Sequence, residues 1–350
     1  MARKRADFIK LDFDHRRVLA LKVQKDFQGE YRYDAYLARR CPSYSRSLIQ
    51  RLIKEGLVTV SGRSIKPSSV VQRGDQIRLE LPLILMPQVQ PKDIPLEILY
   101  EDEHLIAINK PPNFVVHPAA GHWDDTLVNA LLHHCGTLPE TDEIYKPGIV
   151  HRIDKDTSGV ILAAKTIAAH KALTAQFADR TTRKEYRAIV EGRLERDADV
   201  IDRPMGRSQR DWKKMAVYDA VDDARDIKEA VTEYEVLERF HGFTLVAARP
   251  RTGRTHQIRV HLASIGHPIV GDATYGRRAS LSPADLVDER TASGEETVEP
   301  VLDRQALHAA KLTLTHPATG APITFEAPLP ADMDACLALL RRVRSEARGR

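Results

Sequence analysis

Four prolines, Pro82, Pro87, Pro91 and Pro95, fall close together in the first third of the chain and limit what can form there. Proline has no backbone N–H and cannot continue a helix or the interior of a sheet. Because the stretch also lacks a helical period, we expect a semi-rigid linker over residues 83–96. The other expected parts are a leading extension over 1–30, a small module over 31–82, a larger domain over 97–330 and a closing helix over 331–350.

Charge is distributed unevenly between these parts. Residues 1–80 hold 18 Lys and Arg against 9 Asp and Glu, whereas the remaining residues hold 35 against 40. A module with a large positive excess suits a polyanionic partner, because clustered cations attract phosphates. We expect the densest basic group, which contains a single acid, to contact RNA phosphates. Its members are Arg39, Arg40, Arg46, Arg51, Lys54, Arg63 and Lys66.

The small module has the pattern of two helices and two strands. Apolar residues at helical spacing predict helices over 33–39 and 46–55, and Gly56 is placed to end the second helix. Alternation predicts strands over 57–60 and 76–81. The module resembles the αL-like S4-type RNA-binding domain. The resemblance is carried by Tyr33-x-x-x-Leu37, by Ser45-Arg46-Ser47-x-x-Gln50-Arg51-Leu52-Ile53-Lys54-Glu55-Gly56-x-Val58-x-Val60-Ser61-Gly62 and by Val71-x-x-Gly74-Asp75.

The larger domain has many strands and few helices. This is typical of an α+β fold with a mainly antiparallel mixed sheet, not of alternating βαβ units. Strands are predicted over 98–100, 105–109, 160–164, 184–191, 231–237 and 243–248, and helices over 126–134, 166–178 and 255–264.

The rest of the composition indicates a cytoplasmic protein. No apolar run approaches the length of a membrane span, and the basic run at residues 1–5 is not followed by the apolar stretch of a secretory signal. The three cysteines, Cys41, Cys135 and Cys336, are far apart and form no CxxC pair. This spacing argues against a disulfide framework or a cysteine zinc site and fits a reducing compartment.

The residues that indicate chemistry lie in three segments of the larger domain. A polar, charge-dense loop over 148–159 contains Asp154 and precedes a buried strand. Such a loop can hold a carboxylate beside solvent and ligand, although alone it is more often a salt-bridged turn. In the segment 250–262, Arg259 lies off the apolar stripe of a helix and is free to meet a carboxylate. Tyr186, on a third segment, is either a core aromatic or a stacking platform for an unstacked base.

Together these segments resemble the RluA/RluD family of pseudouridine synthases, and with the S4-like module the resemblance covers nearly all of the chain. The residues that carry it are Asn109-Lys110-Pro111-Pro112-x-x-Val115-Val116-His117-Pro118, Thr126-Leu127-Val128-Asn129-Ala130-Leu131-Leu132, His151-Arg152-Ile153-Asp154, the segments of Tyr186 and Arg259, Gly271-Asp272-x-x-Tyr275-Gly276 and Arg304-Gln305-Ala306-Leu307-His308-Ala309. The family more often has Leu at position 153, and Ile is a conservative replacement.

The resemblance implies four residue roles. Asp154 matches the catalytic aspartate, and Arg152 matches the arginine that helps displace the target base. Tyr186 matches the tyrosine beside the uracil, and Arg259 matches the basic residue that pairs with the aspartate. Pseudouridylation breaks the N1–C1′ bond of uridine, turns the uracil and joins C5 to C1′. We expect no metal and no cofactor, because a carboxylate can act as the nucleophile or as a base at the sugar.

Three other functions are weighed against this one. A non-catalytic RNA-binding protein would need only the small module. A glycoside hydrolase would need two carboxylates that flank a sugar, whereas Asp154 and Asp156 alternate along one segment and tend to face apart. The histidines show no HExxH spacing that would indicate a zinc enzyme, and loop or capping roles explain them. They are His117, His122, His133, His134, His256 and His261.

Within the family, two stretches look most like the D branch, which acts on the large ribosomal subunit. They are His117-Pro118-Ala119-Ala120-Gly121-His122 and Leu131-Leu132-His133-His134. The resemblance implies uridines of large-subunit ribosomal RNA as substrate, with the C branch, or other ribosomal or transfer RNA uridines, as alternatives. The expected partner is therefore this RNA or a pre-ribosomal particle, and the protein is expected to be a monomer.

Overall fold

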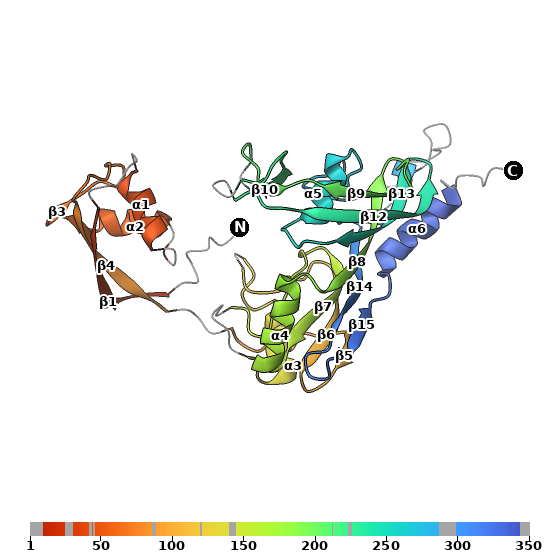
Figure 1. Ribbon diagram of the computed structural model, residues 1–350, viewed down its shortest axis with the longest axis horizontal. Coiled ribbons are helices and arrows are strands. Elements are labelled where there is room, and N and C mark those ends of the chain that lie inside the picture. The colour runs from red at the N-terminus through yellow and green to blue at the C-terminus, as the bar shows by residue number, and fades with distance from the viewer. Residues whose placement is uncertain are drawn as a thin grey trace. The chain divides into compact units, whose positions relative to one another are not determined.

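The computed structural model divides into two compact units, Met1–Gln88 and Val89–Arg350 (Figure 1). The residues it describes are 10–24, 31–41, 44, 46–85, 89–119, 121–139, 145–211, 213–222, 226–286 and 299–343. In these ranges, no helix has both the length and the apolar character that a membrane crossing needs.

The first unit packs two helices on a four-stranded antiparallel sheet. Its elements are β1 (Lys10–Lys22), α1 (Tyr33–Arg40), α2 (Arg46–Lys54), β2 (Val58–Val60), β3 (Arg63–Ser64) and β4 (Gln76–Leu85), and the sheet order is β1-β4-β2-β3. Leu37 of α1 and Ile49 and Leu52 of α2 are fully buried in one core with Leu79 of β4. Both predicted helices and both predicted strands of this unit are confirmed.

The sheet of this unit extends beyond the expected module at both ends. The leading extension contributes β1, which pairs along the length of β4, and the expected linker begins inside β4, because residues 83–85 still pair with β1. Strand β4 contains Pro82, which has no N–H to donate to the hydrogen-bond ladder. The register between β1 and β4 shifts opposite Pro82, between Asp12 and Arg16. Such a bulge lets a strand continue past a proline.

The second unit is built on a nine-stranded sheet, in which the order is β5-β6-β7-β14-β8-β13-β12-β9 and β15 pairs with β14. These strands are β5 (Ile98–Glu101), β6 (Leu105–Lys110), β7 (Ser158–Ala164), β8 (Arg183–Glu191), β9 (Ala198–Asp202), β12 (Val231–Phe240), β13 (Phe243–Pro250), β14 (Leu307–Thr315) and β15 (Pro322–Glu326). Only the β7–β14 pair is parallel among them, so the expected α+β class with a mainly antiparallel mixed sheet is confirmed.

The remaining elements of this unit are α3 (Leu127–Cys135), α4 (Ile167–Ala178), the β10–β11 hairpin (Met205–Arg207 and Met215–Val217), α5 (Gln257–Ser264), the 3₁₀ turn η3 (Pro283–Leu286) and α6 (Ala331–Val343). All six strands predicted for the larger domain are present. The prediction missed β9, β10, β11, β14 and β15, of which all but β14 have five residues or fewer. Short strands give little alternation for a sequence pattern to detect.

Strands β6 and β7 are covered on both faces. Ile106 and Ile108 pack in the cluster that includes α3, whereas Leu105 and Ala107 pack in the cluster that includes α4. Figure 1 shows both helices at this end of the sheet. Every residue of β7 is buried for the same reason, as is expected of a strand with both faces in a core. The loop that precedes β7 therefore emerges from a rigid part of the fold.

Gly159 sits where β7 meets β14, opposite Ala309. Its φ is +106°, and a Cβ added to it would overlap the backbone carbonyl oxygen of Ala309. Any side chain at this position would therefore push apart the two strands that meet beside the loop.

We predict that Gly159→Ala lowers the free energy of unfolding by more than about 2 kcal/mol, because it combines an unfavourable φ with a backbone overlap. Gly320→Ala is the matched control, since Gly320 has a φ of +71° and no atom within 4 Å of an added Cβ. Denaturant unfolding of both variants measures the difference. Equal losses would show that the overlap is relieved without cost.

Candidate active site

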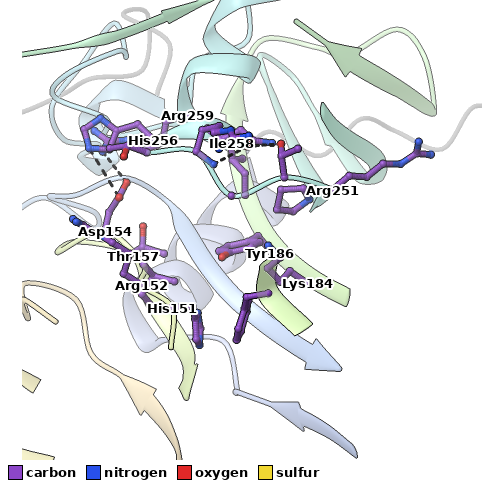
Figure 2. A pocket seen from close by; sticks show the side chains of 18 of the residues that line it. His151, Arg152, Asp154, Thr157, Lys184, Tyr186, Arg251, His256, Ile258 and Arg259 are labelled. Carbon is purple, nitrogen blue, oxygen red and sulfur yellow. Dashed lines mark hydrogen bonds and ion pairs between the residues drawn. The ribbon is translucent and has the colours of Figure 1, made fainter. Parts of the chain in front are cut away.

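A pocket of about 430 Å³ brings together the three segments that the sequence singled out (Figure 2). Its walls come from the loop before β7, which carries Arg152 and Asp154, from the start of β8, which carries Tyr186, and from the turn that leads into α5, which carries Arg259. All four residues proposed from the family resemblance therefore line one cavity.

Asp154 and Arg259 form an ion pair at the wall of this pocket. The Arg259 Nη1 atom lies 3.0 Å from the Asp154 Oδ2 atom. The Arg259 side chain is only 7% exposed, and that of Asp154 is 19% exposed. One oxygen of the carboxylate is thus held by the protein, while the group keeps access to the cavity.

The other edge of the Arg259 guanidinium is held by Asp272. Its Nε and Nη2 atoms donate to the two Asp272 carboxylate oxygens at 2.7 and 2.8 Å, and the Asp272 side chain is 1% exposed. Burial opposes the charged form of Asp272, but Arg259 and the backbone N–H groups of Thr274 and Tyr275 keep its pKa below the ordinary value. A carboxylate with this many donors stays ionised. Asp272 therefore fixes the orientation of the arginine that faces Asp154.

The role of Asp272 was not predicted, although it lies in the Gly271-Asp272-x-x-Tyr275-Gly276 motif. The backbone explains the glycine beside it. Gly271 has a φ of +73°, and an added Cβ would overlap the Arg304 carbonyl oxygen. A buried acid after a sterically required glycine is the signal that could have identified this anchor.

Lys110, which is fully buried, binds the loop that carries Asp154. Its Nζ atom donates to the carbonyl oxygens of Lys155, Phe114 and Pro111 at 2.7–2.9 Å. Burial lowers the pKa of Lys110 to about 7, while the three carbonyl acceptors match the three N–H donors of the charged form. This lysine therefore ties the Asp154 loop to the end of β6.

Two residues of the segment before β14 hold the next two residues of the same loop. The Arg304 Nη1 atom donates to the Asp156 carbonyl oxygen at 3.0 Å, and the Gln305 Nε2 atom donates to the Thr157 Oγ1 atom at 3.1 Å. Arg304 is itself fixed by Asp332 at the start of α6. The three residues that follow Asp154 are thus each held by a side chain from another segment.

The turn before α5 is fixed by the buried side chain of Gln257. Its Oε1 atom accepts from Thr252 Oγ1 at 2.7 Å and from the Arg254 N–H at 3.0 Å. Its Nε2 atom donates to the Val231 carbonyl oxygen at 2.9 Å. Helix α5 begins at Gln257, two residues later than predicted, because His256 has a left-handed backbone conformation with φ 58° and ψ 21°.

His256 lies closer to Asp154 than its predicted loop or capping role implies. It stands at the N-cap of α5 but makes no capping hydrogen bond with its side chain. Instead its Nδ1 atom is 2.9 Å from the Tyr275 hydroxyl, and its Nε2 atom is 4.0 Å from Asp154 Oδ1. Burial lowers its pKa. By contrast, both ring nitrogens of His261 are engaged by Thr232 and by the Arg203 carbonyl, as a structural histidine requires.

Tyr186 and Arg152 lie on different parts of the wall. Tyr186 stands on β8 between Ala309 of β14 and Ala248 of β13, and burial, with the nearby Asp154 charge, raises its pKa. It is a neutral phenol with a ring facing the cavity (Figure 2). Arg152 is exposed, so it can move toward a bound ligand.

The seven basic residues predicted to bind RNA lie in the first unit, and all of them are exposed. Four of them already make contacts within the protein. Arg46 donates to the buried carboxylate of Asp34, and Arg51 pairs with Glu55. Arg39 and Arg40 stack over the rings of Tyr31 and Tyr36. In the described part of the chain, Lys54, Arg63 and Lys66 form no ion pair.

The chain is similar to known proteins along most of its length. The family model of RNA pseudouridylate synthases matches residues 104–264, and the S4 domain model matches residues 32–77. The chain is 44% identical over 318 residues to ribosomal large subunit pseudouridine synthase D of Pseudomonas aeruginosa, covering 90% of this chain and 94% of that protein. It is 41% identical over 315 residues to the RNA pseudouridine synthase YlyB of Bacillus subtilis, covering 90% and 96%.

Solved structures show the same fold. Human RNA pseudouridylate synthase domain containing 4 is 27% identical, with a TM-score of 0.50 over 70% of this chain and 93% of that chain. The human domain containing 1 protein has a TM-score of 0.51 at 23% identity, over 73% of this chain and 98% of that one. From the extent of the matches along both sequences, the chain belongs to the RNA pseudouridine synthase family and includes an S4 domain.

Proposed function

We propose that this protein converts uridines of large-subunit ribosomal RNA into pseudouridine, with Asp154 as the catalytic carboxylate. The observation that carries the assignment is the Asp154–Arg259–Asp272 arrangement, which holds one oxygen of a partly exposed carboxylate beside a cavity. Membership of the RNA pseudouridine synthase family argues against the two alternatives, a non-catalytic RNA-binding protein and a glycoside hydrolase.

The reaction needs a carboxylate beside the sugar and space for the base to turn. The N1–C1′ bond breaks, C5 bonds to C1′, the C5 proton leaves, and N1 gains a proton, so the reaction is an isomerisation. Asp154 can act as a nucleophile or as a base in this sequence. The Arg259 guanidinium fixes the direction of the Asp154 carboxylate, because an ion pair at 3.0 Å in a partly closed pocket is weakly screened.

Tyr186 and Arg152 suit the task of holding the base outside the RNA stack. Extracting a base costs a few kcal/mol, and contact with an aromatic ring offsets part of this cost. Tyr186 offers a ring in the cavity that contains Asp154. Arg152, exposed at the same cavity, can occupy the space that the base leaves in the RNA.

Two observations support ribosomal RNA as the substrate. The P. aeruginosa relative, similar over nearly its whole length, is named for the large ribosomal subunit. The S4 domain of this chain adds an exposed basic surface, which suits a structured RNA because phosphates supply most of the sequence-independent binding energy. We expect the protein to act in the cytoplasm as a monomer.

We predict that Asp154→Asn abolishes activity, with a loss of at least about 10³-fold in rate, because the amide can act neither as a nucleophile nor as a base. Tritium release from ribosomal RNA labelled at uridine C5 measures the reaction. The control is Asp156→Asn, which changes the other carboxylate of the loop and is expected to keep most of the activity. RNA binding by Asp154→Asn should persist. A variant that still releases tritium at the wild-type rate would refute the assignment.

We predict that Arg259→Lys lowers the single-turnover rate by about 10²-fold while leaving RNA affinity nearly unchanged. A lysine can meet Asp154 or Asp272 but cannot bridge them as the guanidinium does, so the carboxylate is misplaced. Arg251→Lys is the control, since Arg251 lies on the same turn and pairs with Glu233 at the surface. A wild-type rate in Arg259→Lys would mean that the bridge to Asp272 has no part in the reaction.

We predict that the S4 unit contributes phosphate contacts through its unpaired cations. Replacing Lys54, Arg63 and Lys66 together by Gln should reduce the slope of log K against log salt concentration by up to about 0.9 per lost contact. Filter binding to ribosomal RNA at several salt concentrations measures the slope. The control is Arg196→Gln, which removes an arginine that is paired with Asp199. An unchanged slope in the triple variant would exclude this surface.

A further inference from the structure

We propose that Lys184 binds a backbone phosphate of the RNA next to the target uridine, in a corner of the pocket that it forms with Gly253. This inference rests on the proposed function and adds to it a contact for the RNA backbone inside the cavity.

The position of Lys184 follows from the strand. It precedes Tyr186 by two residues on β8, so both side chains leave the same face of the strand, and both line the pocket. Two residues of a strand span roughly 6.6 Å. If the uracil lies against Tyr186, as proposed, Lys184 therefore lies next to the bound nucleotide (Figure 2).

The charge of Lys184 is not balanced by the protein. In the described ranges its Nζ atom makes no ion pair and no hydrogen bond, and it lies 5.9 Å from the centroid of the Phe177 ring. Burial and the charge of Arg180 lower its pKa. The neighbouring acid, Glu185, belongs to the opposite face of β8, where it binds Arg187 and Arg249. Lys184 is partly buried, and a cation that loses part of its hydration without gaining a counterion costs folding free energy, so an anionic ligand would stabilise it.

The other cations of this corner make contacts within the protein. Arg180 binds the carboxylate of Glu229 at 2.8 Å, whereas Arg254 donates to the Glu229 backbone carbonyl oxygen at 3.1 Å. His151, which lies near Lys184, is partly buried, and burial lowers its pKa to about 3, so it is neutral. Among the described cations of this corner, Lys184 is therefore the one whose charged group makes neither an ion pair nor a hydrogen bond.

Gly253 leaves the space that a ligand would use. A Cβ added to this glycine would meet only one group within 4 Å, the Lys184 Nζ atom at 3.7 Å. A side chain at position 253 would therefore touch the ammonium, whereas glycine leaves that face of the ammonium uncovered toward the pocket that both residues line. RNA carries its negative charge on its phosphates, so a phosphate is the ligand that this corner suits.

The first test compares Lys184→Met with Lys184→Arg by the salt dependence of RNA binding. Both are made in the Asp154→Asn background, so that binding is measured without turnover. Losing one phosphate contact should reduce the slope of log K against log salt by about 0.7–0.9, which makes the affinity loss between 50 and 200 mM salt about threefold smaller. Lys184→Arg should keep the wild-type slope. The control is Arg183→Met, an exposed neighbour outside the pocket. A full slope in Lys184→Met overturns the proposal.

The second test locates the phosphate. A ribosomal RNA hairpin that the enzyme modifies is synthesised with an uncharged methylphosphonate at the linkage 5′ or 3′ to the target uridine. One of these should weaken binding to the Lys184-containing protein but not weaken binding to Lys184→Met any further. Additive losses at both linkages would overturn the phosphate contact and favour a contact to the uracil. The outcomes are separate from the proposed function, which fails instead if the wild-type protein forms no pseudouridine in ribosomal RNA.

Discussion

The geometry of the pocket depends on one guanidinium that bridges two carboxylates. Arg259 holds the buried Asp272 with two hydrogen bonds and the more exposed Asp154 with a third. A planar, permanently charged fork can satisfy both partners at once, which a lysine cannot do. Backbone N–H groups fix Asp272 in the protein interior. Asp272 in turn orients Arg259, and Arg259 orients Asp154 at the cavity. Asp154 is the last member of this chain of contacts and the one that a substrate can reach.

The same carboxylate is positioned from its backbone as well. Lys110 lies at the end of β6 and Arg304 in the segment before β14. Both bind carbonyl oxygens of the residues that follow Asp154. Side-chain and backbone restraints thus reach the loop from different parts of the chain. A catalytic group needs to be held within fractions of an ångström, and a loop alone does not supply this. The rigid, doubly covered strands β6 and β7 supply the support.

The sequence predicted the elements that have a strong local period and the site residues that lie in recognisable motifs. The helices of the S4 domain show such periods, and Asp154, Tyr186 and Arg259 do line one pocket. What it did not predict depends on contacts between distant segments. The role of Asp272 requires the approach of the turn after α5 to Asp154, and β1 becomes part of a sheet only by pairing with β4. Pairing over such separations leaves no periodic trace in the residues themselves.

Two lysines of the same unit illustrate how the surroundings of a charge distinguish a structural role from a binding role. Lys110 is fully enclosed, and its three donors meet three carbonyl oxygens, so the protein uses every interaction that the ammonium can make. Lys184 is partly buried, and among the described residues its ammonium makes no ion pair or hydrogen bond, lies over an aromatic ring and borders the cavity. The first arrangement is complete without a ligand. The second is incomplete, and an anion is what completes it, because burial makes an uncompensated charge costly and a paired one tolerable.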